Sequence, residues 1–98
     1  MKNWSVYIIK CDGRYLYTGI STDVNRRFGE HHSKNGKAAK YTRPFSSIDL
    51  VYKTLIGDRS LASKIEYQIK KLPKKKKELI VSSRFDRDEL IEFLELDQ

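Results

Sequence analysis

Four side chains suited to phosphate chemistry occur at short intervals in the first third of the sequence. Tyr7 and Tyr17 lie either side of a Cys-Asp-Gly segment, and Arg27 and His31 follow within the next fourteen positions. A guanidinium binds phosphate through two parallel hydrogen bonds, an imidazole titrates near neutral pH, and a phenol donates a hydrogen bond or takes a proton. Together they indicate phosphodiester chemistry. The plainer interpretation is that the tyrosines pack a strand and that the arginine and histidine are solvated.

The spacing of Arg27 and His31 places them on one face of a helix, because residues four apart are neighbours there. This face adjoins the apolar stripe of the same segment. Arg26 and His32 face elsewhere and are interpreted as surface residues, with Arg26 also a candidate phosphate contact.

Glu66 is the acid of a segment, LASKIEYQIKKL, whose other charges are lysines. It is either a residue at the border of an apolar stripe or an oxygen ligand for Mg²⁺ or Mn²⁺, which need only one or two carboxylates. The lysines near it form a solvated face by default, and on a basic protein they are also candidates for non-specific phosphate contacts. The candidates are Lys70, Lys71, Lys74 and Lys75.

Residues 4–10 and 15–20 are rich in aromatic and β-branched types and flank a turn, which predicts a β-hairpin. A two-residue turn at Asp12-Gly13 would put the two tyrosines on opposite faces of the sheet. A three-residue loop of residues 11–13 would put Tyr7 directly opposite Tyr17. The Asp-Gly pair slightly favours the first.

The remaining pattern predicts one more strand and a series of helices. The expected elements are a helix from about Thr22 to about His32 capped by Ser21 or Thr22, a mobile loop over 33–47, a strand over 48–54, a helix capped by Asp58 or Ser60, a helix over 74–81 opened by Pro73, and a C-terminal amphipathic helix. We therefore expect an α/β (α+β) fold, in which helices flank a small, mostly antiparallel sheet of three strands.

The 98 residues are enough for one domain, over 1–83, with 84–98 as an acidic helical extension rather than a second domain. The net charge is +7; residues 84–98 hold two basic and six acidic residues, which gives −4, so 1–83 hold +11. A basic body of this kind suits a polyanion such as nucleic acid.

No apolar run reaches the roughly 20 residues of a membrane span, and the sequence shows no signal-peptide pattern, so we expect a cytoplasmic protein, a monomer by default. The lone Cys11 forms neither an internal disulfide nor a zinc site.

Several motifs together carry a resemblance to a known family. They are VYII, then LYTG, then an arginine ten positions after the second tyrosine, a histidine four further on and a glutamate in the following helix. With GISTDVNRRFGEHH and GDRSLASKIEYQIKKL, the region from Trp4 to about Val81 resembles the GIY-YIG nuclease superfamily and its small stand-alone bacterial members. Here Ser-Val-Tyr replaces the Gly-Ile-Tyr of the first family motif, and Tyr-Thr-Gly replaces the Tyr-Ile-Gly of the second. Several family nucleases have an asparagine after the glutamate, and this sequence has no asparagine after position 35.

The resemblance implies a nuclease that hydrolyses one DNA strand with a single divalent metal, selecting DNA structure rather than sequence, in repair or processing. Residue by residue, Glu66 matches the metal-binding glutamate of the family, which would hold Mg²⁺ or Mn²⁺. From their chemistry we expect Tyr7 to position or deprotonate water with His31 as proton acceptor, and Arg27 and Tyr17 to clamp the phosphate. Which tyrosine is the base stays open. Such a site needs both tyrosines on one face, which selects the three-residue loop. Two alternatives stay open: a non-catalytic nucleic-acid-binding module that retains the fold, and a protein-interaction adaptor whose acidic tail competes with nucleic acid.

Overall fold

The computed structural model describes residues 3–33, 42 and 44–96, which form three strands and four helices. The elements are β1 (Trp4–Cys11), β2 (Tyr15–Ser21), α1 (Val24–Ser33), β3 (Ile48–Gly57), α2 (Arg59–Lys70), α3 (Lys74–Ser83) and α4 (Arg87–Phe93). The strands form one antiparallel sheet in the order β2-β1-β3. The expected α+β fold is thereby confirmed.

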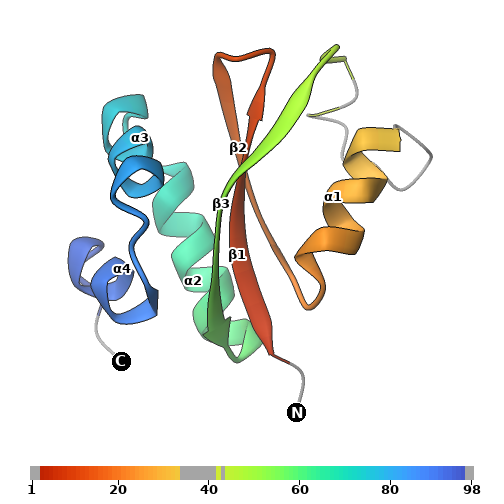
Figure 1. The fold of residues 1–98 in the computed structure, drawn as a ribbon. Helices are drawn as coiled ribbons and strands as arrows, with labels where there is room; N and C mark the ends of the chain where they lie inside the picture. The colour runs from red at the N-terminus through yellow and green to blue at the C-terminus, as the bar shows by residue number, and fades with distance from the viewer. Residues whose placement is uncertain (1–2, 34–41, 43, 97–98) are drawn as a thin grey trace.

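The central strand β1 is covered on both faces, which explains why it is apolar along most of its length. Helix α1 lies against one face, and α2, α3 and α4 lie on the other (Figure 1). Because successive strand side chains point to opposite faces, Val6 and Ile8 join the larger core under α2 to α4. Tyr7 and Ile9 join the smaller core under α1. Both tyrosine candidates therefore belong to the α1 side of the sheet.

The hairpin register differs from both expected registers. Cys11 pairs with Tyr15, so the loop is residues 12–14, and Tyr7 faces Gly19 while Tyr17 faces Ile9. Asp12 and Gly13 both have positive φ, at 50° and 66°, and form a tight turn that Arg14 N–H closes on the Cys11 carbonyl. The expected loop over 11–13, with Tyr7 directly opposite Tyr17, is therefore wrong. The expectation that the two tyrosines share a face is correct.

Tertiary hydrogen bonds at Asp12 explain this register. Its backbone N–H donates to the Ser47 carbonyl, and its carboxylate accepts from the backbone N–H groups of Ser46 and Ser47 at 3.0 and 2.9 Å. Cys11 meanwhile pairs with Ile48 at the start of β3. The hairpin end is thus fastened to the chain that enters β3, an interaction that the hairpin sequence alone does not contain.

The element boundaries otherwise lie close to the expected ones. Asp23, rather than Ser21 or Thr22, caps α1, because its carboxylate accepts from Arg26 N–H at 3.1 Å. Strand β3 continues to Gly57, three residues beyond the expected end, and Asp58 caps α2 as expected. The loop expected over 33–47 falls mainly outside the described residues.

The C-terminal segment packs on the larger core. Leu90 is fully buried and Ile91 nearly so. The Tyr52 hydroxyl of β3 donates to the Phe85 carbonyl at 2.6 Å, and Arg87 Nε donates to the Ile56 carbonyl at 2.8 Å. Helix α4 is therefore attached to β3, the strand at the opposite edge from β2.

Within the described ranges, no helix combines the length and apolar character that crossing a membrane requires.

Candidate active site

The two tyrosines lie side by side on the α1 face of the sheet. The ring centroids of Tyr7 and Tyr17 are 6.5 Å apart, and both rings approach His31, at 6.1 and 5.3 Å between centroids. Tyr7 is only 1% exposed, whereas Tyr17, on an edge strand, is partly exposed. The hairpin and α1 thus bring two phenols and an imidazole into one cluster.

Gly19 makes room for the Tyr7 ring. It is the cross-strand partner of Tyr7, and a Cβ at this position would lie 2.6 Å from Tyr7 Cζ and closer still to the hydroxyl oxygen. Any side chain here would push the Tyr7 ring aside. The glycine after Tyr17-Thr18 is therefore required by the packing of the first tyrosine.

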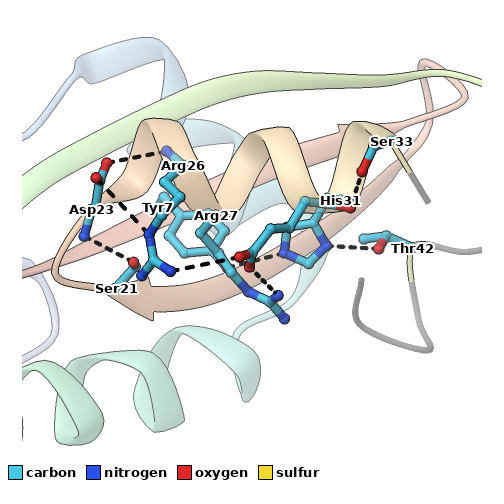
Figure 2. Close-up of polar contacts among 9 residues, drawn as sticks. Tyr7, Ser21, Asp23, Arg26, Arg27, His31, Ser33 and Thr42 are labelled. Atoms are coloured by element: carbon cyan, nitrogen blue, oxygen red, sulfur yellow. Dashed lines mark hydrogen bonds and ion pairs between the residues drawn. The ribbon is translucent and has the colours of Figure 1, made fainter. Parts of the chain in front are cut away.

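His31 forms a buried polar chain with Tyr7 and Thr42. Its Nε2 lies 3.2 Å from the Tyr7 hydroxyl and its Nδ1 lies 2.8 Å from Thr42 Oγ1, as Figure 2 shows. All three side chains are nearly or fully buried. Burial, and after it the charge of Arg27, lower the pKa of His31 to about 4, so the imidazole is neutral at physiological pH.

Arg27 lies one helical turn before His31 and points toward the same cluster. It donates a hydrogen bond to Glu30 Oε1 at 2.9 Å, and its positive charge acts on the Tyr7 phenol. Burial is the main cause that raises the pKa of Tyr7 to about 12, and Arg27 acts against this increase. Tyr7 is therefore a protonated phenol at neutral pH, held between a neutral imidazole and a guanidinium.

Glu66 reaches the cluster from α2, on the other side of the sheet. Its negative charge is the smallest of the causes that act on the pKa of Tyr7. Lys70 links the two layers around the β2 edge: its Nζ is 3.4 Å from Glu66 Oε2 and 5.8 Å from the Tyr17 ring centroid. The carboxylate is partly buried, with 24% of its side-chain surface exposed, and so is reachable from solvent.

Tyr7, Tyr17, Arg27 and His31 therefore lie together on the α1 face, and Glu66 lies in the other layer, linked to them through Lys70 at the β2 edge. The predicted phosphate contacts lie at different distances from this site. Lys70 is part of the cluster, whereas Lys71 lies over the ring of Tyr67 on the exposed side of α2. Lys74 and Lys75 are exposed at the start of α3. Arg26 is exposed and pairs with Asp23 and Glu30 at 4.0 and 3.6 Å, so its charge is partly compensated.

Sequence reasoning missed Glu30, Gly19 and Thr42. Glu30 follows Arg26 by four residues and Arg27 by three, a spacing that predicts ion pairs on a helix, so the signal was present. In the sequence, Gly19 appeared only as the glycine of the LYTG motif, with no indication of its contact with Tyr7. Thr42 lies eleven residues beyond His31, outside any periodic element, and no local pattern indicates its contact.

Comparisons with known proteins identify the family of the chain. Residues 3–79 match the family model described as the GIY-YIG catalytic domain. The chain is 42% identical over 95 residues to the UPF0213 protein YhbQ of Escherichia coli strain K12, covering 97% of this chain and 93% of YhbQ. It is 46% identical over 78 residues to a UPF0213 protein of Photorhabdus laumondii, covering 80% of this chain and 73% of that protein. Among solved structures it is similar to the solution NMR structure of a UPF0213 protein from Bacillus halodurans, with 40% identity, a TM-score of 0.54 and coverage of 84% and 85%.

Proposed function

The chain belongs to the GIY-YIG family, and we propose that it is a metal-dependent endonuclease that hydrolyses phosphodiester bonds in DNA. The observation that supports the proposal is the cluster of two phenols, a guanidinium and an imidazole on the α1 face, with the Glu66 carboxylate of the opposite layer linked to it through Lys70 at the β2 edge. We propose that it acts in DNA repair or processing in the cytoplasm. The geometry of the site, rather than the names of its relatives, supports this function.

Glu66 fits a divalent metal that is held by a single carboxylate. Among the described residues, no group of three or more His, Cys, Asp or Glu side chains is arranged to hold a metal ion. Mg²⁺ does not need such a cage, because it commonly keeps several waters and is held by one or two carboxylates and substrate phosphates. When bound, the ion would neutralise charge that develops on the phosphate oxygens.

Of the remaining groups, two contact the phosphate and two act on the attacking water. Arg27, oriented by Glu30, supplies a fixed positive charge to the phosphate, and Tyr17 supplies a partly exposed hydroxyl. Tyr7 orients the water and takes its proton, with His31 as the acceptor for the phenolic proton. Because burial raises the pKa of Tyr7 to about 12 and lowers that of His31 to about 4, both groups are neutral at pH 7, and we expect cleavage to slow as the pH falls toward 4 and His31 becomes protonated.

The basic surface favours recognition of DNA shape rather than sequence. The candidate lysines at the end of α2 and the start of α3 are flexible point charges that contact phosphates, which carry no base information. With a net charge of +7, we expect binding to weaken steeply as the salt concentration rises.

The test compares branched, nicked, flapped and single-stranded DNA and RNA, incubated with Mg²⁺, Mn²⁺ or EDTA. We expect cleavage of a DNA substrate in the presence of metal, and a loss of at least about 100-fold in Tyr7→Phe and Glu66→Gln. Tyr67→Phe and Glu78→Gln, at exposed positions of α2 and α3, are the matched controls and should keep full activity.

Two outcomes would contradict the proposal. Equal trace cleavage by the wild type, Tyr7→Phe and Glu66→Gln would indicate a contaminating nuclease. Salt-sensitive binding that persists in EDTA, without cleavage of any substrate, would instead identify a nucleic-acid-binding module that retains the fold.

A further inference from the structure

Thr42 is a buried polar residue whose hydroxyl is directed at the imidazole. It is fully buried, and its Oγ1 lies 2.8 Å from His31 Nδ1. Figure 2 shows it approaching His31 from the side opposite to Tyr7, from a segment outside the strands and helices. A hydroxyl can either accept a hydrogen bond from Nδ1–H or donate one to a bare Nδ1, and the two cases give His31 opposite tautomers.

The groups around Tyr7 distinguish these cases. The hydrogen bond between the Tyr7 hydroxyl and His31 Nε2 needs one donor and one acceptor. If His31 Nε2 carried the proton, the Tyr7 oxygen would accept the hydrogen bond. The phenolic O–H would then have no acceptor among its partners in the described part of the chain, in a side chain that is 1% exposed. Buried polar hydrogens are rarely left unpaired, so Nε2 is the acceptor and the proton of His31 is on Nδ1.

We infer that Thr42 is a positioning residue: its hydroxyl accepts the Nδ1 proton of His31 and thereby keeps the Nε2 lone pair directed at Tyr7. The role of Thr42 in cleavage rests on the proposed function, whereas the tautomer of His31 does not. When Tyr7 takes a proton from water, its own proton passes to Nε2. The imidazolium then has two N–H groups, and Thr42 already provides the acceptor for the one on Nδ1. Without Thr42, an Nε2–H imidazole would donate to Tyr7 and could not accept its proton.

The test uses ¹⁵N NMR of the full chain in the wild type, Thr42→Ser and Thr42→Val. Two-bond ¹H–¹⁵N correlations report which imidazole nitrogen carries the proton, and exposed His32 gives an internal reference. We expect the Nδ1–H tautomer of His31 in the wild type and Thr42→Ser, and its loss in Thr42→Val. With a cleavable DNA, Thr42→Val should lower kcat about tenfold or more with KM unchanged, and Thr42→Ser should restore it.

The tautomer separates this inference from the proposed function. An Nε2–H tautomer in the wild type would overturn the role of Thr42 without any variant, as would an unchanged Nδ1–H tautomer in folded Thr42→Val. If no nucleic acid is cleaved but the tautomer follows Thr42 as expected, the proposed nuclease fails and the assignment of Thr42 stands.

Discussion

Tyr7 shows how one residue position depends on another across a strand pair. Its ring occupies the space that a side chain on Gly19 would fill, and its hydroxyl contacts His31. Protein interiors are packed so closely that one extra methyl group forces its neighbours to move. The position of the phenol is therefore set as much by the absence of a side chain at Gly19 as by the groups that hydrogen-bond to it.

Gly19→Ala tests this dependence. The added methyl group should displace the Tyr7 ring, lower the free energy of unfolding by about 1–3 kcal/mol and reduce cleavage to the level of Tyr7→Phe. Gly29→Ala is the matched control: it lies in α1 with open space around the new Cβ, and should stabilise the protein by about 0.5–1 kcal/mol. Chemical denaturation and a cleavage assay measure both effects. Full stability and activity in Gly19→Ala would show that Tyr7 does not need this space.

The lowered pKa of His31 predicts a pH dependence of stability. The imidazole ionises near pH 6.5 in the unfolded chain and near 4 in the folded one, so the unfolded state binds the extra proton first on acidification. The contribution of neutral His31 is fully present above about pH 6.5 and is lost as the pH falls toward 4. Between these values, wild-type unfolding free energy should fall faster than that of His31→Gln, by roughly 1 kcal/mol per pH unit. Urea denaturation at pH 7, 6 and 5 compares the slopes, and equal slopes would show that His31 ionises normally.

At the scale of elements, the sequence predicted the order of strands and helices, because this order follows from local patterns. Tyr7, Arg27 and His31 could be placed on faces by the periods of a strand and a helix. The hairpin register could not be predicted, since Asp12 is fixed by hydrogen bonds to residues 46 and 47, more than thirty positions away. Thr42 was missed for the same reason: its partner is tertiary, and no local period points to it.

At the scale of the whole molecule, the sheet separates the α1 side of the candidate site, with Tyr7, Tyr17 and His31, from the acidic C-terminal helix. The cluster lies at the β2 edge, whereas α4 contacts β3 at the opposite edge and lies on the other face of the sheet from α1 (Figure 1). Exposed charges further apart than about 8 Å are largely screened at physiological ionic strength. The acidic helix therefore has little means of competing with nucleic acid for the α1 side of the site, and its buried Leu90 indicates a structural role.

Variants of α4 can separate stability from charge. Leu90→Ala removes a fully buried side chain and should lower the free energy of unfolding by about 2–5 kcal/mol, while the fraction that stays folded binds DNA as the wild type does. The double variant Asp88→Asn/Glu92→Gln removes two exposed charges and spares Asp86 and Glu89, which form the capping box of α4. We expect its stability to change by less than about 0.5 kcal/mol, and its DNA affinity at physiological salt to change by less than about threefold. Denaturation curves and fluorescence anisotropy at several salt concentrations measure both quantities. A tenfold gain in affinity on removing only these two charges would mean that the acidic helix does mask the basic surface, and that screening across the sheet is weaker than its geometry implies.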